Sequence, residues 1–133
     1  MESSSDAILS VTPDGFVTTW NGGAGHIFGY TANEMIGRSI LTIIPSHLSR
    51  DRAWELATAR GTHDIQNYDA VRLSKDGRYI DGSVTLSPLK DAVGQFLGVS
   101  QVIRDISERK QAETLLKQAH EALEMKVLER TAE

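Results

Sequence analysis

The chain has 133 residues, of which 40% are hydrophobic and 24% are charged, a composition that fits one soluble globular domain plus one long helix. The formal net charge of −4 argues against nucleic acid as the main partner, because phosphate binding needs concentrated lysine and arginine. The lack of cysteine excludes disulfides, thiolate metal sites and cysteine nucleophiles, and it fits a cytoplasmic protein. No apolar stretch is long enough to cross a membrane, so we expect no membrane contact by this segment.

The first twenty residues predict a β-hairpin. Two short apolar runs, 7–11 and 16–20, flank the turn segment 12–15, in which proline and the Asp-Gly pair supply turn dihedrals. Asn21 then follows as the N-cap of a helix that is weakened by three glycines.

Two further helices are predicted before residue 62. Thr31 and Glu34 have the spacing of a capping box and begin a short helix. A longer amphipathic helix starts at Ser46 or Ser49 and stops at Gly61. Its expected buried residues are Leu48, Ala53, Trp54, Leu56 and Ala57.

Three strands are predicted next, at residues 65–73, 79–89 and 95–106, with turns at 76–77 and 91–94. Two strands, several helices, three strands and a final helix form an α+β order. We therefore expect an antiparallel sheet with helices across one face, followed by a long C-terminal helix.

The last strand passes into that helix with almost no loop. From residue 108 to residue 133 the helix could extend about 39 Å, at 1.5 Å per residue. A helix joined directly to a sheet transmits strain, whereas a flexible linker absorbs it.

One narrow apolar stripe runs along this predicted helix, and no further domain is available to cover it. A parallel helix from a second chain is the natural cover, so we expect a parallel homodimer through a coiled coil. The stripe shifts register after its fourth member. Its residues are Ala112, Leu116, Ala119, Leu123 and the displaced Val127.

Four motifs in order resemble those of PAS domains. Residues 105–109 read DISER, which resembles the signature that closes these domains, and residues 28–38 read FGYTANEMIGR. The hairpin tip KDG at 75–77 and the strand start GQFLGV at 94–99 also match. The resemblance implies an antiparallel five-stranded sheet in the order 2-1-5-4-3, with a PAS domain at 1–107 and a signalling helix at 108–133.

The resemblance implies a non-catalytic sensory module of a bacterial signal-transduction protein of the two-component type. Residues 123–133 resemble linkers that precede output domains in bacterial sensor kinases, so the parent protein is expected to be a histidine kinase or a diguanylate cyclase. The module would relay a ligand or conformational signal from the sheet into a dimeric output helix. Two alternatives are a pure dimerisation scaffold and a haem- or flavin-binding redox or gas sensor.

A PAS fold encloses a cavity between its sheet and its long helix, and a small-molecule ligand there competes with an apolar filled core as the prediction. The candidate wall residues are Trp54, Asn67, Tyr68, Arg72 and Gln101. His47 is the best remaining haem ligand, although the family position for it falls near Arg52. We predict no cofactor and no metal, and the lack of cysteine excludes flavin adduct chemistry.

The joint between strand and helix supplies the candidate relay residues. Asp105 is expected to accept hydrogen bonds from the first helical turn, and Ser107 to cap the helix through its hydroxyl group. Arg109 and, on the family resemblance, Lys75 are the candidate cations for the Asp105 carboxylate.

Overall fold

The structure, a computed structural model, describes the backbone of residues 6–62 and 64–131 and the side chains up to residue 124. Its centre is an antiparallel five-stranded sheet in the order β2-β1-β5-β4-β3, which confirms the predicted fold and strand order. The strands are β1 (Ala7–Val11), β2 (Val17–Trp20), β3 (Gln66–Leu73), β4 (Tyr79–Lys90) and β5 (Phe96–Asp105). The helices are α1 (Gly22–Phe28), α2 (Ala32–Met35), the 3-10 turn η1 (Ile40–Ile43), α3 (Ser49–Arg60) and α4 (Ser107–Thr131).

The short helices start where the predicted capping residues stand. The side chain of Asn21 accepts a hydrogen bond from the amide of Ala24 at 2.8 Å. Thr31 and Glu34 form both hydrogen bonds of a capping box. Each cap satisfies amides that have no partner inside the helix, so these starts are determined locally.

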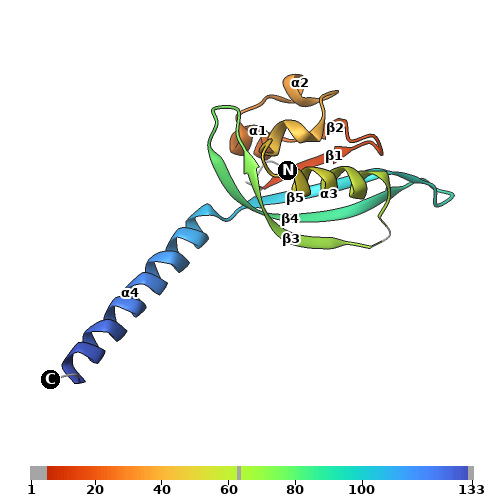
Figure 1. Cartoon of the computed structure of the whole chain (residues 1–133). Helices are drawn as coiled ribbons and strands as arrows, with labels where there is room; N and C mark the ends of the chain where they lie inside the picture. Colours follow the sequence, from red (N-terminus) through yellow and green to blue (C-terminus); the bar gives the residue numbers. More distant parts are fainter. Residues whose placement is uncertain (1–5, 63, 132–133) are drawn as a thin grey trace.

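The helices α1, α2 and α3 cover one face of the sheet, and the core lies between the two layers (Figure 1). Side chains from alternate positions of each strand point into this layer, as the two-residue period of a strand requires. The largest fully buried apolar side chains are Leu9, Val11, Phe28, Met35, Ile40, Ile43, Ile44, Leu86 and Ile103.

The buried face of α3 differs from the prediction. Ala53, Trp54 and Ala57 are exposed, and the helix buries Glu55, Thr58 and Ala59 instead. The apolar pattern was misleading because the interior beneath α3 is polar, so a charged residue has partners there. The helix begins at Ser49, and the residue before it supplies no side-chain cap.

The helix α4 projects away from the sheet (Figure 1). Its predicted stripe residues Ala112, Leu116, Ala119 and Leu123 are all exposed, Leu116 to 73%. The side chain of Val127 lies outside the described residues. None of the described helices combines the length and hydropathy needed to cross a membrane.

Gly98 provides a test of how β1 and β5 are packed together. Its φ is 142°, and a Cβ atom there would lie 2.1 Å from the carbonyl oxygen of Val11. We expect Gly98→Ala to lower the free energy of unfolding by more than about 2 kcal/mol, measured by urea denaturation with tryptophan fluorescence. The matched control is Gly61→Ala, at an extended φ of 173° with nothing within 4 Å of the added Cβ. Equal stabilities of the two variants would contradict the tight approach of the strands.

Candidate functional site

A buried polar cluster joins α3 to the inner face of the sheet. It consists of Glu55 from α3, Tyr68 and Arg72 from β3, and Gln101 from β5, and we call it the Glu55 cluster. Glu55 and Arg72 are each 1% exposed, and Gln101 is 2% exposed. Glutamate and arginine are almost never fully buried unless they are paired, so the contacts within the cluster are decisive.

The carboxylate of Glu55 lies at the centre of these contacts. The side-chain amide of Gln101 donates a hydrogen bond to Glu55 Oε1 at 2.5 Å. The hydroxyl group of Tyr68 donates to Oε2 at 3.3 Å, and Arg72 Nη2 lies 3.6 Å from the same oxygen. A single carboxylate therefore ties α3 to two strands of the sheet.

The period of the strands brings these residues together. Tyr68 and Arg72 are four positions apart in β3, so they share one face. Gln101 shares the inner face of β5 with Val99 and Ile103, which are both buried. The cluster is thus a polar interruption in an otherwise apolar face, placed under the middle of α3.

Two polar atoms of the Glu55 cluster have no hydrogen-bond partner among the described residues. Arg72 Nη1 donates to the carbonyl group of Val71 at 3.1 Å, but Arg72 Nε is buried without an acceptor. Gln101 Oε1 is buried without a donor. Unpaired buried atoms of this kind are costly, so Arg72 Nε requires an acceptor and Gln101 Oε1 requires a donor.

The cluster also changes the acidity of Tyr68. Burial raises the pKa of Tyr68, and the negative charge of Glu55 raises it further. The phenol therefore stays protonated at physiological pH and acts as a hydrogen-bond donor to the carboxylate.

Three of the five predicted wall residues belong to the cluster: Tyr68, Arg72 and Gln101. Trp54 lies at its margin, 45% exposed, with its ring edge-on to Tyr68 at 6.2 Å between centroids. Asn67 lies on the opposite face of the sheet and donates a hydrogen bond to Thr85. Asn67 is adjacent to Tyr68 in a strand, so the two side chains cannot share a face.

Glu55, the central residue, was absent from the sequence prediction. A signal for it existed, because an arginine on the inward face of a strand needs an anionic partner. The apolar interpretation of α3 assigned the wrong side of the helix to the core and left Glu55 with the solvent-facing residues.

His47, the candidate haem ligand, lies outside the cluster. Its ring is exposed and packs edge-on against Tyr79, with 6.1 Å between centroids. Arg52, at the family position for that ligand, donates from Nη1 to the carbonyl groups of Leu41 and Ile44. Among the residues that the structure describes, no group of metal-ligating side chains comes together.

The joint between β5 and α4 partly matches its prediction. Asp105 Oδ1 accepts a hydrogen bond from the amide of Ser107 at 2.9 Å, as expected for a carboxylate at a helix start. Ser107 was expected to precede the helix and cap it through its hydroxyl group. It is instead the first residue of α4, so it does not occupy the N-cap position. The amide of Ile106 donates to the carbonyl group of Asp81 at 2.8 Å and so fixes the joint to β4.

The expected cation partners of Asp105 lie elsewhere. Lys75 pairs with Glu34 at 2.5 Å, because the β3–β4 hairpin tip reaches the helical layer at α2. Arg109 lies 4.0 Å from Asp69 and 3.7 Å from Glu113. The carboxylate that pairs with the cations in the first turn of α4 is therefore Asp69 on β3.

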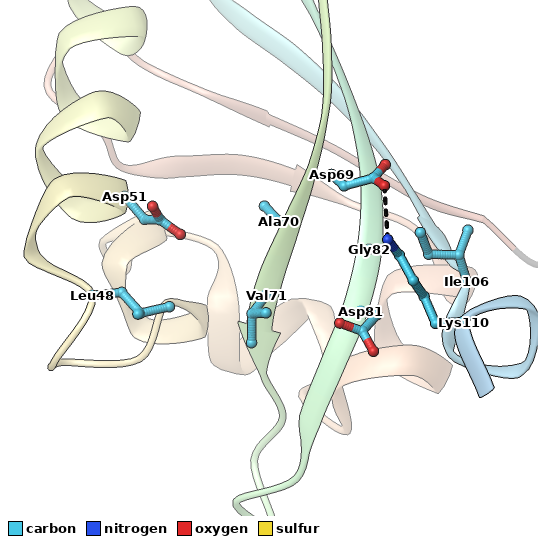
Figure 2. Close-up of a pocket in the computed structure, with 9 residues that line it drawn as sticks. All are labelled: Leu48, Asp51, Asp69, Ala70, Val71, Asp81, Gly82, Ile106 and Lys110. Carbon is cyan, nitrogen blue, oxygen red and sulfur yellow. Dashed lines mark ion pairs between the residues drawn. The ribbon is translucent and has the colours of Figure 1, made fainter. Parts of the chain in front are cut away.

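A surface groove with a volume of about 320 Å³ lies beside this joint, and we call it the joint groove. In Figure 2, Asp69 and Lys110 point toward one another, and Lys110 Nζ lies 3.3 Å from Asp69 Oδ2. Its walls come from α3, β3, β4 and the start of α4. The lining residues are Leu48, Asp51, Asp69, Ala70, Val71, Asp81, Gly82, Ile106 and Lys110.

The five-stranded sheet, the helices on one face of it and the helix that follows β5 almost directly place the chain in a class of small α+β domains. A sequence model described as the PAS fold matches residues 1–111, and the chain belongs to this family. PAS domains of this kind are sensory modules and carry no catalytic site of their own. The fold is similar to a PAS domain from Colwellia psychrerythraea, with a TM-score of 0.71 and 23% identity, over 79% of this chain and 89% of that one.

Two curated relatives are signalling proteins. The chain is 34% identical to Two-component system protein A of Emericella nidulans over 120 residues, which cover 86% of this chain and 17% of that protein. It is 32% identical to Sensor protein TdiS of Thauera aromatica over 112 residues, which cover 80% of this chain and 20% of that protein. The chain therefore spans about a fifth of the length of these relatives.

The Glu55 cluster predicts an asymmetric response to mutation. Glu55→Ala leaves Arg72 buried without its counter-charge and should cost about 3–5 kcal/mol of stability in urea unfolding. The double variant that combines Glu55→Leu and Arg72→Met should lose clearly less stability than Glu55→Ala, because no unpaired charge is left in the interior. The control Glu121→Ala, at an exposed position of α4, should change stability by less than about 0.5 kcal/mol. A double variant no more stable than Glu55→Ala would show that the ion pair is not the central contact.

Proposed function

We propose that this chain is the sensory module of a bacterial signal-transduction protein and relays a signal from the Glu55 cluster into a dimeric output helix. The observation that carries the proposal is the position of Gln101 on β5. Gln101 contacts Glu55 in the interior, and the same strand ends at Asp105, with only Ile106 between it and the start of α4. A change in the cluster thus acts on the strand to which α4 is attached.

The relatives support this proposal through their names, a two-component system protein and a sensor protein. We propose that the parent protein carries an output domain beyond α4, such as a histidine kinase or diguanylate cyclase. The scattered basic residues and the lack of cysteine support a cytoplasmic module without a nucleic-acid partner.

We propose a small polar molecule as the signal. The unpaired Arg72 Nε requires an acceptor, and the unpaired Gln101 Oε1 requires a donor. A ligand that supplies both would compete with Glu55 for its partners and loosen α3 from the sheet. A conformational signal from a neighbouring domain would act on the same contacts without any ligand.

The ligand hypothesis is tested by native mass spectrometry of the freshly purified chain, with an absorption spectrum as a second measurement. We expect a retained small molecule and no visible absorption band. Gln101→Met should release the retained molecule while the protein stays folded by circular dichroism. Asn67→Ala, on the opposite face of the sheet, is the matched control and should keep it.

Other outcomes identify the alternatives. A chain that retains nothing and shows no thermal shift with small polar metabolites would favour the dimerisation scaffold. A visible band lost in His47→Ala would favour the haem sensor.

The dimer hypothesis concerns the exposed apolar stripe of α4. Leu116→Glu with Leu123→Glu places charges at two predicted interface positions, and the variant should be monomeric by light scattering at roughly 50 µM. Gln118→Glu, on another face of the same helix, should remain dimeric. A wild-type chain that is monomeric at this concentration would contradict the coiled-coil output.

A further inference from the structure

The strand β3 has different contacts on its two faces. It is an edge strand, hydrogen-bonded only to β4 within the described sheet. Tyr68 and Arg72 point inward and contact Glu55 of α3, as described above. Asp69, between them, lies on the outer side in the joint groove and contacts α4 (Figure 2). One strand therefore meets α3 and α4 through adjacent residues.

Asp69 forms ion pairs with both basic residues in the first turn of α4. Its Oδ2 atom lies 3.3 Å from Lys110 Nζ and 4.0 Å from Arg109 Nη2. The three side chains are about half exposed, and exposed ion pairs contribute little to stability. A weak contact of this kind suits a reversible adjustment of the helix better than a fixed attachment.

The other contacts at the base of α4 fix where the helix begins. The Ile106 amide is bonded to Asp81 of β4, and Asp105 caps the amide of Ser107. Lys110 lies four residues after Ile106, about 6 Å further along the helix. Its ion pair with Asp69 therefore acts on the direction of α4, at a point beyond the joint.

The joint groove is also in contact with α3. Leu48 and Asp51, at the start of α3, line the same groove as Lys110 (Figure 2). A displacement of α3 would therefore alter the surroundings of the Asp69–Lys110 pair as well as the Glu55 cluster.

We infer that Asp69 is a positioning residue that couples α3 to the output helix through β3. This inference rests on the proposed function, because it takes α4 as the output helix. When α3 moves, Glu55 displaces Tyr68 and Arg72, and the movement of β3 carries Asp69 relative to Lys110 and Arg109. The signal then reaches α4 by two routes, covalently along β5 and electrostatically from β3.

Amide hydrogen exchange of the intact chain tests the coupling, with the amides of residues 110–113 as the readout. Asp69→Asn should speed their exchange about two- to fivefold, the range expected for the loss of an exposed ion pair. Glu55→Gln, which lies on α3, should also speed it. The double variant should exchange no faster than the faster single variant, because both substitutions interrupt the same route from α3 through β3 to α4.

Asp81→Asn is the matched control. It removes a carboxylate from the same groove, but its side chain makes no ion pair among the described residues, and its backbone bond to Ile106 is retained. We expect exchange at residues 110–113 to stay at the wild-type rate. If Asp81→Asn speeds exchange as much as Asp69→Asn does, the effect comes from the net charge of the groove and not from the ion pair of Asp69. That result would overturn the proposal.

Two further results would also overturn it. One is wild-type exchange in Asp69→Asn, and the other is a fully additive double variant. Where Glu55→Gln does not fold, Tyr68→Phe replaces it, because it removes only the hydroxyl contact to Glu55. The proposed function fails independently of these results, through a monomeric wild-type chain or a cluster variant that leaves ligand retention unchanged.

Discussion

The buried carboxylate of Glu55 is the interaction on which the arrangement of this domain depends. It holds α3 on the sheet by accepting from Tyr68 and Gln101 and by pairing with Arg72. An apolar helix face would fix α3 through many small contacts of similar strength. Here polar contacts contribute to the attachment, and such contacts can be exchanged for contacts with another polar partner. The proposed entry of a signal at this point rests on that property of the interior.

The sheet connects this interior to α4 because its central strand continues into the helix. β5 is bonded on both sides, to β1 and β4, and it runs from Gln101 to the joint within a few residues. The edge strand β3 reaches α4 separately, through Asp69. The helix α4 is attached to β5 through the polypeptide backbone and to β3 through an ion pair. A change in either attachment would change the direction of the helix. The base of α4 is thus in contact with two strands of the PAS sheet, β5 and β3.

The sequence alone supported most of the fold but only part of the site. The helix caps at Asn21 and Thr31 and the strands could be predicted, because turn chemistry, capping and alternation are local properties. The strand order came from the family resemblance and is confirmed. The buried face of α3 was predicted wrongly, since an amphipathic pattern assumes that the interior is apolar. Tyr68, Arg72 and Gln101 were found as polar residues of the predicted cavity wall, while Glu55 was not.

By itself, the sequence determined the order of the elements, their bounds to within a few residues, and which strand residues share a face. Only the tertiary structure decided which charged groups meet. Glu55 is paired with Arg72, Glu34 with Lys75, and Asp69 with Lys110. Each pair joins elements that are distant in sequence, and several arrangements of these charges satisfy the same local pattern. The choice among them follows from the register of β3 on β4 and the position of α3 above the sheet, because ion pairs form only at short range.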